Sequence, residues 1–249
     1  MKIVVCVSTV PDSTTKIKVG GSGKSIDEAG VTFIINPYDE YAVEEAVQLK
    51  EKNGGEVIAV TFGNDKSKEG IKKAFQMGAD KGILIKALSN DFDSVTVSRN
   101  LAAVIKEINP DIVLFGKQSI DFDGLIVPKM TAEFLNLPSV NVVTKLEING
   151  TDATIEREIE GGKEILKAKL PLVIGTQKGL NTPRYPNLKS IMASKSKPIE
   201  EKSAIDEPVK SSVLEMNLPA AKGQGKIFSD GVSSVPELVR LLREEAKVI

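Results

Sequence analysis

The sequence contains no histidine and no tryptophan, and only one cysteine among its 249 residues. Without histidine, the chain cannot form a Ser-His-Asp triad or a histidine-liganded metal site. A single cysteine excludes an internal disulfide and a CxxC redox pair, which fits a reducing compartment. No apolar run approaches the length that spans a bilayer, so we expect no membrane insertion. Carboxylate or lysine chemistry stays open, but redox activity would require an organic cofactor, held by this chain or jointly with a partner.

The net charge and the length of the chain exclude further classes of function and indicate how large its core is. The formal net charge is -1, with lysines interspersed among acids, so no overall field favours nucleic acid. At 41% hydrophobic residues, the chain can bury one sizeable core and carry an additional arm. The apolar run at residues 2–8 begins at once. We therefore expect no targeting segment and a cytoplasmic location. Because the chain has no histidine and only one cysteine, we also expect no metal site.

The first two-thirds of the sequence alternate between strand-like and helix-like patterns. Ser94–Ile108, for example, places Val97, Leu101 and Val104 on one helical face. Continuous apolar strands separated by helices predict an α/β fold with a parallel, Rossmann-like sheet covered by helices on both faces. The predicted strands are 2–8, 56–62, 82–85, 111–115 and 172–175, and the predicted helices are 36–52, 67–77, 94–108 and 127–135.

The pattern changes after Pro138. Residues 140–148, 153–159 and 164–168 read as antiparallel strands joined by turns at Asn149-Gly150 and Gly161-Gly162. We expect residues 199–234 to lack regular structure and residues 235–247 to form a final helix. A structureless stretch of this length does not suit a self-contained domain. We therefore expect a nucleotide-binding α/β domain at 1–198 and an arm at 199–249 that packs on a partner subunit, with disorder as the alternative.

Residues 170–200 form the most informative segment. A buried strand at 172–175 is followed by Pro183 and Pro186, which exclude a regular helix before Lys189. The segment exposes Leu188, and Pro198 ends it. A long irregular stretch with an exposed leucine is costly unless it docks onto another molecule. Residues 180–198 are therefore predicted to be a recognition loop.

A second candidate site lies at 116–124, between a predicted parallel strand and the next helix. Open α/β sheets bind ligands at this position, where backbone N–H groups and the helix dipole face an anion. An ordinary turn would look the same. Asn36–Asp39 alone reads as a helix start, and Cys6 as a small buried hydrophobe.

Five segments together resemble the electron-transfer flavoprotein β subunit, in that family's order and spacing across residues 1–200. They are NPYDEYAVEEAVQLKEK, KKAFQMGAD, FGKQSID, IEREIEGG and LNTPRYPNLKSIM. The resemblance implies an adenine-nucleotide-hydrolase-like fold and a heterodimer with an α subunit that holds most of one FAD. It also implies a carrier without catalytic residues of its own, which moves electrons from acyl-CoA dehydrogenase-type flavoenzymes, as in fatty acid oxidation, to a membrane quinone oxidoreductase.

The resemblance also implies an AMP site and two partner-binding surfaces. Leu188, with Ile191 and Met192, would dock the dehydrogenase, and Glu158 would face the α subunit. The nucleotide would contact Cys6, Asn36, Pro37, Tyr38, Asp39, Phe62, Gly116, Lys117, Gln118, Ser119, Ile120, Asp121, Phe122, Asp123, Gly124, Leu125, Ile126 and Val127.

Three departures from the family leave alternatives open. Gly124–Val127 replaces small or polar residues that hold the phosphate in most relatives, so side-chain donors are missing. Ser8 and Ala193-Ser194 stand where relatives usually have lysines. The alternatives are a bifurcating β subunit with a second FAD in the nucleotide site, a stand-alone adenine-nucleotide enzyme, and a structural nucleotide-sensing module.

Overall fold

A computed structural model describes residues 1–90, 92–221, 223 and 225–249. The chain divides into two compact units, Met1–Glu215 and Met216–Ile249, which are described separately. No helix within the described residues is long and apolar enough to cross a membrane.

The first unit is built on one nine-stranded sheet, and the predicted α/β class is confirmed. Seven strands run parallel, and the last two continue the same sheet as antiparallel strands. In spatial order the strands are β11 (Ile199–Ser203), β5 (Lys81–Lys86), β4 (Glu56–Gly63), β1 (Lys2–Cys6), β6 (Ile112–Gly116), β10 (Leu172–Thr176), β7 (Ser139–Asn149), β8 (Asp152–Ile159) and β9 (Gly162–Lys169).

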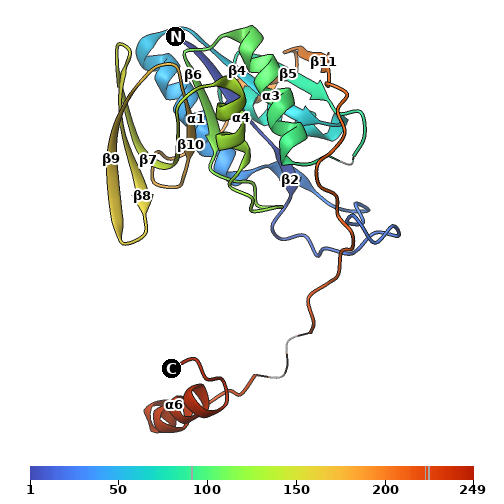
Figure 1. The fold of residues 1–249 in the computed structure, drawn as a ribbon, viewed down its shortest axis with the longest axis vertical. Helices are drawn as coiled ribbons and strands as arrows, with labels where there is room; N and C mark the ends of the chain where they lie inside the picture. The colour runs from blue at the N-terminus through green and yellow to red at the C-terminus, as the bar shows by residue number, and fades with distance from the viewer. Residues whose placement is uncertain (91, 222, 224) are drawn as a thin grey trace. The chain divides into compact units, whose positions relative to one another are not determined.

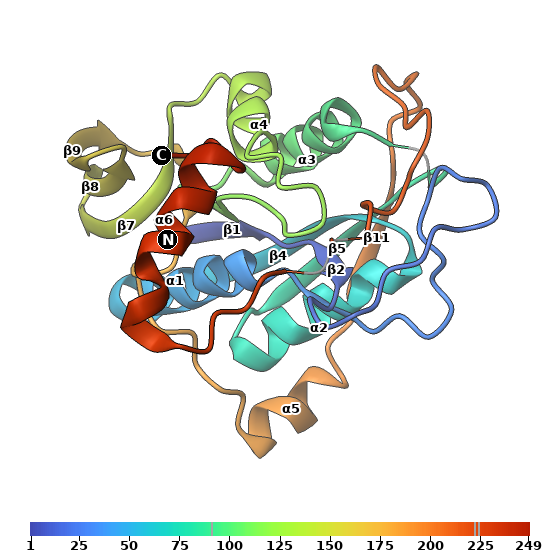
Figure 2. The ribbon, with the colours of Figure 1, turned by 90° about the horizontal axis from the view of Figure 1, so that it is seen from below.

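Helices cover both faces of the parallel part of the sheet, as Figure 2 shows. One layer contains α1 (Pro37–Asn53) and α2 (Lys68–Met77), and the other contains α3 (Ser94–Ile108) and α4 (Val127–Leu135). Alternation along β1 sends Ile3 and Val5 into the first layer and Val4 and Cys6 into the second. Because the central strands are buried on both sides, they are apolar throughout, and their carboxyl ends meet at one edge.

The antiparallel strands β7, β8 and β9 extend from the parallel sheet (Figure 1). Asn149 pairs with Asp152 and Ile159 pairs with Gly162, so both connections are two-residue turns. The turns are therefore Gly150-Thr151 and Glu160-Gly161, each one residue away from its predicted position. Gly150 and Gly161 have φ of 62° and 79°, a conformation that glycine adopts without strain.

The segment after β10 departs from the sequence prediction in two places. Helix α5 spans Leu188–Ser194, so it starts one residue earlier than the prolines suggested, with Asn187 as its N-cap. Residues 199–203, predicted to be structureless, form strand β11, which pairs in parallel with β5. Shorter elements are β2 (Thr9–Pro11), β3 (Phe33–Ile35) and the 3-10 helices η1 (Asp65–Ser67) and η2 (Gly231–Ser234).

The second unit, Met216–Ile249, contains η2 and helix α6 (Val235–Glu244). This helix ends three residues before the predicted Lys247. In α6, Val235 is 49% exposed and Leu238 is 41% exposed, while Leu241 and Leu242 are half-buried. Residues 222 and 224 of the expected arm lie outside the described residues.

Candidate functional site

Asn36 connects the start of α1 to the loop after β6. It occupies the N-cap position of α1, as predicted, but its side chain makes no capping hydrogen bond. Its Nδ2 instead donates to the Gln118 carbonyl at 2.9 Å, and its Oδ1 accepts from the Ile120 amide at 3.2 Å. The side chain is fully buried, so these bonds fix the path of the loop.

Asp39, one turn further along α1, joins the ends of two neighbouring strands. Its Oδ2 accepts from the Ser8 amide at 2.7 Å and from the Ser8 hydroxyl at 2.8 Å. Its Oδ1 accepts from the Gly116 amide at 3.0 Å. Burial raises the pKa of Asp39 to about 6, against the opposing effect of the hydrogen bonds from Ser8, Asn36 and Gly116.

Cys6 lies beside this carboxyl group and is buried. Burial, followed by the nearby charge of Asp39, raises the pKa of the Cys6 thiol. A protonated, enclosed thiol is a poor nucleophile. The buried position agrees with the prediction that Cys6 is a small core residue, with its backbone at the ligand edge of the sheet.

The loop from Gly116 to Val127 follows the carboxyl end of β6, and hydrogen bonds within the loop and to Thr176 determine its path. The amide of Lys117 donates to the Thr176 carbonyl at 2.8 Å, and that of Asp123 to the Ser119 carbonyl at 2.9 Å. The Phe122 amide donates to Asp121 Oδ1 at 2.9 Å. These amides and that of Ile120 are engaged within the chain, so they cannot all form the predicted phosphate cradle.

Donors for an anion remain at the far end of the loop. In the first turn of α4, Pro128 has no amide hydrogen and the Met130 amide donates to the Ile126 carbonyl at 2.9 Å. Only the Val127 and Lys129 amides remain, at the positive end of the helix dipole. Gly124 is open, since a Cβ there would meet only Ile126 Cγ2 at 3.6 Å. Lys117 supplies a cation, with its Nζ 5.0 Å from the centre of the Tyr38 ring. The two amides, the open backbone at Gly124 and the Lys117 cation are the groups of this loop that are available to an anion.

Phe62 lies on the α3 side of the sheet. Its ring meets Phe92 edge-on, with centroids 5.1 Å apart. Both rings line a cavity of about 200 Å³ whose wall also includes Leu88, Thr96 and Ile205. Within the hydrogen bonds described, Phe62 is not joined to the Asn36–Asp39–Gly116 cluster, although its strand, β4, is adjacent to β1.

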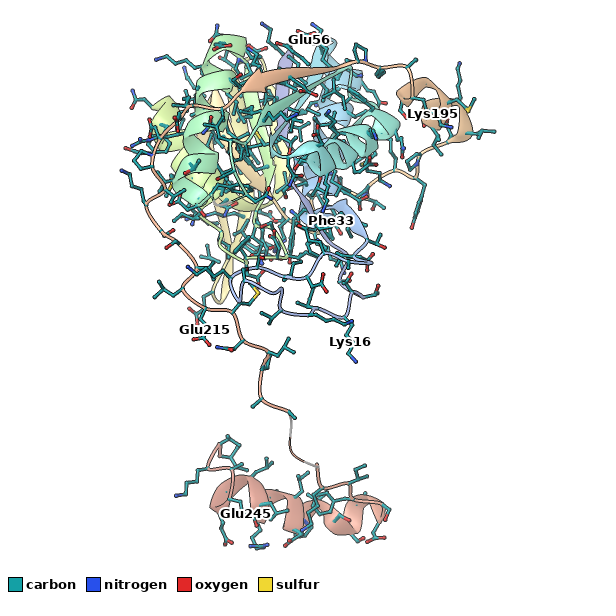
Figure 3. All side chains as sticks on the ribbon, turned by 90° about the vertical axis from the view of Figure 1, so that its right-hand side faces the viewer. Lys16, Phe33, Glu56, Lys195, Glu215 and Glu245 are labelled. Carbon is teal, nitrogen blue, oxygen red and sulfur yellow. The ribbon has the colours of Figure 1, made fainter. Side chains whose placement is uncertain are left out.

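The predicted docking residues lie on α5. Leu188 is 76% exposed and Met192 is 59% exposed, and their spacing of four places them on one helical face. Ile191 is partly buried. Tyr185, just before α5, is 95% exposed, and the sequence analysis did not identify it. Figure 3 shows the segment that carries Lys195 projecting from the first unit with its side chains directed outward.

The start of this segment is fixed to α1 by Arg184. Its Nε and Nη2 donate to the two carboxylate oxygens of Glu44 at 2.8 and 3.0 Å, and Nη1 and Nη2 to those of Glu51 at 2.7 and 3.0 Å. The Arg184 backbone amide also donates to Glu44 Oε2 at 3.0 Å. Nearby, Asn181 Nδ2 donates to Glu45 Oε2 at 2.9 Å. Burial opposes ionisation of Glu44, but the hydrogen bonds that it accepts from Arg184 and Gln48 lower its pKa.

Glu158, the predicted contact with the α subunit, is exposed on β8 and accepts a hydrogen bond from Gln177 Nε2. This bond connects β8 to the residue that follows β10. Among the described residues, no cluster of three or more acidic or cysteine side chains is arranged to hold a metal ion.

Comparison with known proteins agrees with this arrangement. The family model for the electron transfer flavoprotein domain matches residues 24–207. The chain belongs to the electron transfer flavoprotein family. A relative named electron transfer flavoprotein subunit beta, from Bacillus subtilis, is 42% identical with full coverage of both chains. The protein of that name from Syntrophomonas wolfei is 42% identical over 100% of this chain and 98% of its own. The one from Bos taurus is 37% identical, with 100% and 99% coverage.

These matches identify the protein as an electron transfer flavoprotein component of the β-subunit type. Two features of this family member were missed in the sequence. Ser8 was noted only as a departure, although it binds Asp39. Arg184 is 140 residues from Glu44, so no local pattern indicated that they pair.

Proposed function

We propose that this chain is the small subunit of a heterodimeric electron transfer flavoprotein that receives electrons from acyl-CoA dehydrogenase-type flavoenzymes and delivers them to a membrane quinone oxidoreductase. FAD, which supplies the redox chemistry when bound, would be held mainly by the α subunit. This chain would contribute a docking surface and a structural nucleotide site, without catalytic residues. The observation that carries the proposal is the exposed Leu188 on α5, at the end of a segment fixed to α1.

Coexpression with the α subunit tests the assembly. The expected product is a yellow one-to-one complex with a flavin spectrum. A colourless monomer that turns over an adenine nucleotide would instead support the stand-alone enzyme, and a colourless nucleotide-bound monomer the sensing module.

Repeating the coexpression with a chain that ends at Glu215 tests the arm. We propose that residues 216–249 contact the α subunit, because Val235 and Leu238 of α6 are exposed and Leu241 and Leu242 are only half-buried.

Replacing Leu188 by alanine should weaken docking of a dehydrogenase without changing the flavin spectrum. A buried apolar anchor contributes about 1–3 kcal/mol to binding, so KM for the complex should rise by about 5- to 150-fold. The measurement is electron transfer from an acyl-CoA dehydrogenase reduced by its substrate. Leu214→Ala is a matched control, because Leu214 is also strongly exposed, at 85%, but lies outside α5. Unfolding of the Leu188 variant would show that Leu188 supports the core instead.

We also propose that Gly116 to Val127 binds an adenine nucleotide, with its phosphate near Gly124 and the first turn of α4. Cys6, Asn36–Asp39 and Phe62 would form the rest of the site. The support is the open backbone at Gly124 and the cation on Lys117. The apolar Leu125, Ile126 and Val127 supply no side-chain donors, so binding should be weaker than in relatives that have them by about 0.5–1.5 kcal/mol for each missing hydrogen bond.

Gly124→Val should remove the nucleotide without harming the fold. A Cβ at Gly124 makes only ordinary contact and the backbone there does not have positive φ, so the substitution blocks approach to the backbone and little else. The test is mass spectrometry of nucleotides released from the denatured complex. Gly21→Val is the control, because Gly21 is equally open. AMP in the wild type and its loss only in Gly124→Val is the expected result; two FAD per dimer would indicate the bifurcating type, and FAD alone an empty site.

A further inference from the structure

The segment that carries α5 is attached to the first unit at both of its ends. At the start, Arg184 binds Glu44 and Glu51, and Asn181 binds Glu45. At the end, Lys197 Nζ donates to the Ala79 carbonyl at 2.5 Å, and Ile199 begins the strand that pairs with β5. Between these attachments, Tyr185, Leu188 and Met192 are all exposed. Two fixed ends with an exposed middle favour a preformed docking element over a flexible one.

Among the side chains that make these attachments, Arg184 makes the most hydrogen bonds. Its guanidinium group makes four hydrogen bonds to two carboxylates, in the planar fork geometry that only arginine offers. The Glu44 side chain is only 4% exposed, and the Arg184 backbone amide donates to it as well. The backbone and side chain of Arg184 are thereby held to the same carboxylate. Leu188 lies four residues further on, with the exposed Tyr185 between them.

We propose that Arg184 is a positioning residue for docking: by binding Glu44 and Glu51 it fixes the orientation in which α5 presents Leu188 to a dehydrogenase. The inference rests on the proposed docking function. Without the Arg184 hydrogen bonds the Leu188 side chain is unchanged, but the start of the segment is no longer held in one orientation. The partner must then order the segment on binding, and this ordering lowers affinity.

A double-mutant cycle tests the proposal in the complete heterodimer. The variants are Arg184→Lys, Leu188→Ala and the two combined, assayed for KM and kcat with a substrate-reduced acyl-CoA dehydrogenase. Arg184→Lys retains the charge beside Glu44 but loses the paired hydrogen bonds. We expect KM to rise by about tenfold with kcat within about twofold, and this rise to fall below about twofold when Leu188 is already alanine, because positioning a residue that is absent has no effect.

Three controls separate positioning from general stability. Arg99→Gln breaks the Arg99–Glu207 ion pair, whose arginine has a similar exposed fraction, 37% against 34% for Arg184, and should leave KM unchanged. Hydrogen–deuterium exchange should rise in residues 185–197 of Arg184→Lys and nowhere else. If Arg184→Lys unfolds the chain, the pair Arg184→Gln with Glu44→Gln removes both charges together and should give the same rise in KM.

The outcomes distinguish this inference from the proposed function. If Leu188→Ala leaves KM unchanged, docking through α5 is wrong and the inference is overturned with it. If Leu188→Ala raises KM but Arg184→Lys does not, only the positioning role is wrong. An Arg184→Lys effect of equal size in both Leu188 backgrounds also overturns it, because the arginine would then act independently of Leu188.

Discussion

Replacing Gly116 by alanine is expected to lower the free energy of unfolding by about 2–4 kcal/mol, because the new methyl group has no room. Its Cβ would lie 2.3 Å from Asp39 Oδ1 and 2.7 Å from the backbone carbon of Tyr38. The chain cannot relieve this contact cheaply, since the Gly116 amide donates to the same Asp39 oxygen at 3.0 Å. Either the strand end or the start of α1 must shift, and the buried carboxylate loses a donor.

Urea unfolding of wild type and variant measures this change. Gly124→Ala is the matched control, because it places the same methyl group in open space within the same loop, and it should change stability by less than about 0.5 kcal/mol. Equal stability of Gly116→Ala and wild type would mean that α1 and β6 are not held together through Asp39.

Asp39 itself should make stability depend on pH in an unusual direction. Its pKa is raised from 3.8 to about 6 in the folded chain, so the fold binds the proton more tightly than the unfolded chain does. The resulting stabilisation is complete below the unfolded pKa and is lost as pH rises through about 6. A difference of this size corresponds to about 3 kcal/mol. Exposed carboxylates with lowered pKa, such as Glu51, act in the opposite direction.

Comparison with Asp39→Asn isolates this contribution, because the other groups titrate in both proteins. The free energy of unfolding of wild type relative to the variant should fall by about 2 kcal/mol between pH 4 and pH 7. Urea denaturation at half-unit pH intervals gives the curve. A difference that stays constant or grows with pH would contradict the burial of the Asp39 carboxyl group.

The sequence predicted the fold best where a residue pattern is typical of only one kind of secondary structure. The short apolar runs that contain Val4 and Val113 indicated strands buried on both faces, and the spacing of Leu101 and Ile105 indicated an amphipathic helix; the structure has both. Asn36 is a different case, because helix capping and loop binding use the same amide and the sequence cannot show which one wins. Its side chain serves the loop.

Strand β11 and the Arg184 contacts were missed for physical reasons. The strand reads IEEKS, so only Ile199 supplies an apolar signal, which is common for an edge strand protected by charge. Its partners are also distant in the sequence, since it pairs with β5 and Lys68 Nζ lies 2.6 Å from Glu201 Oε1. The Arg184–Glu44 pair likewise joins residues that are 140 positions apart in the sequence. Contacts of this kind arise only after the chain has folded.

The position of β11 in the sheet also sets the distance that the connection from β10 must cover, and this distance is much shorter than the connection. Strands β10 and β11 are five inter-strand spacings apart in the sheet, about 24 Å. The connection from Gln177 to Pro198 has 22 residues, which would reach about 70 Å if fully extended. The surplus length forms α5, which contacts α2 and still leaves Leu188 and Met192 exposed. A homologue with a much shorter connection would have no length for a helix between β10 and β11, and would therefore lack the exposed apolar pair that Leu188 and Met192 form here.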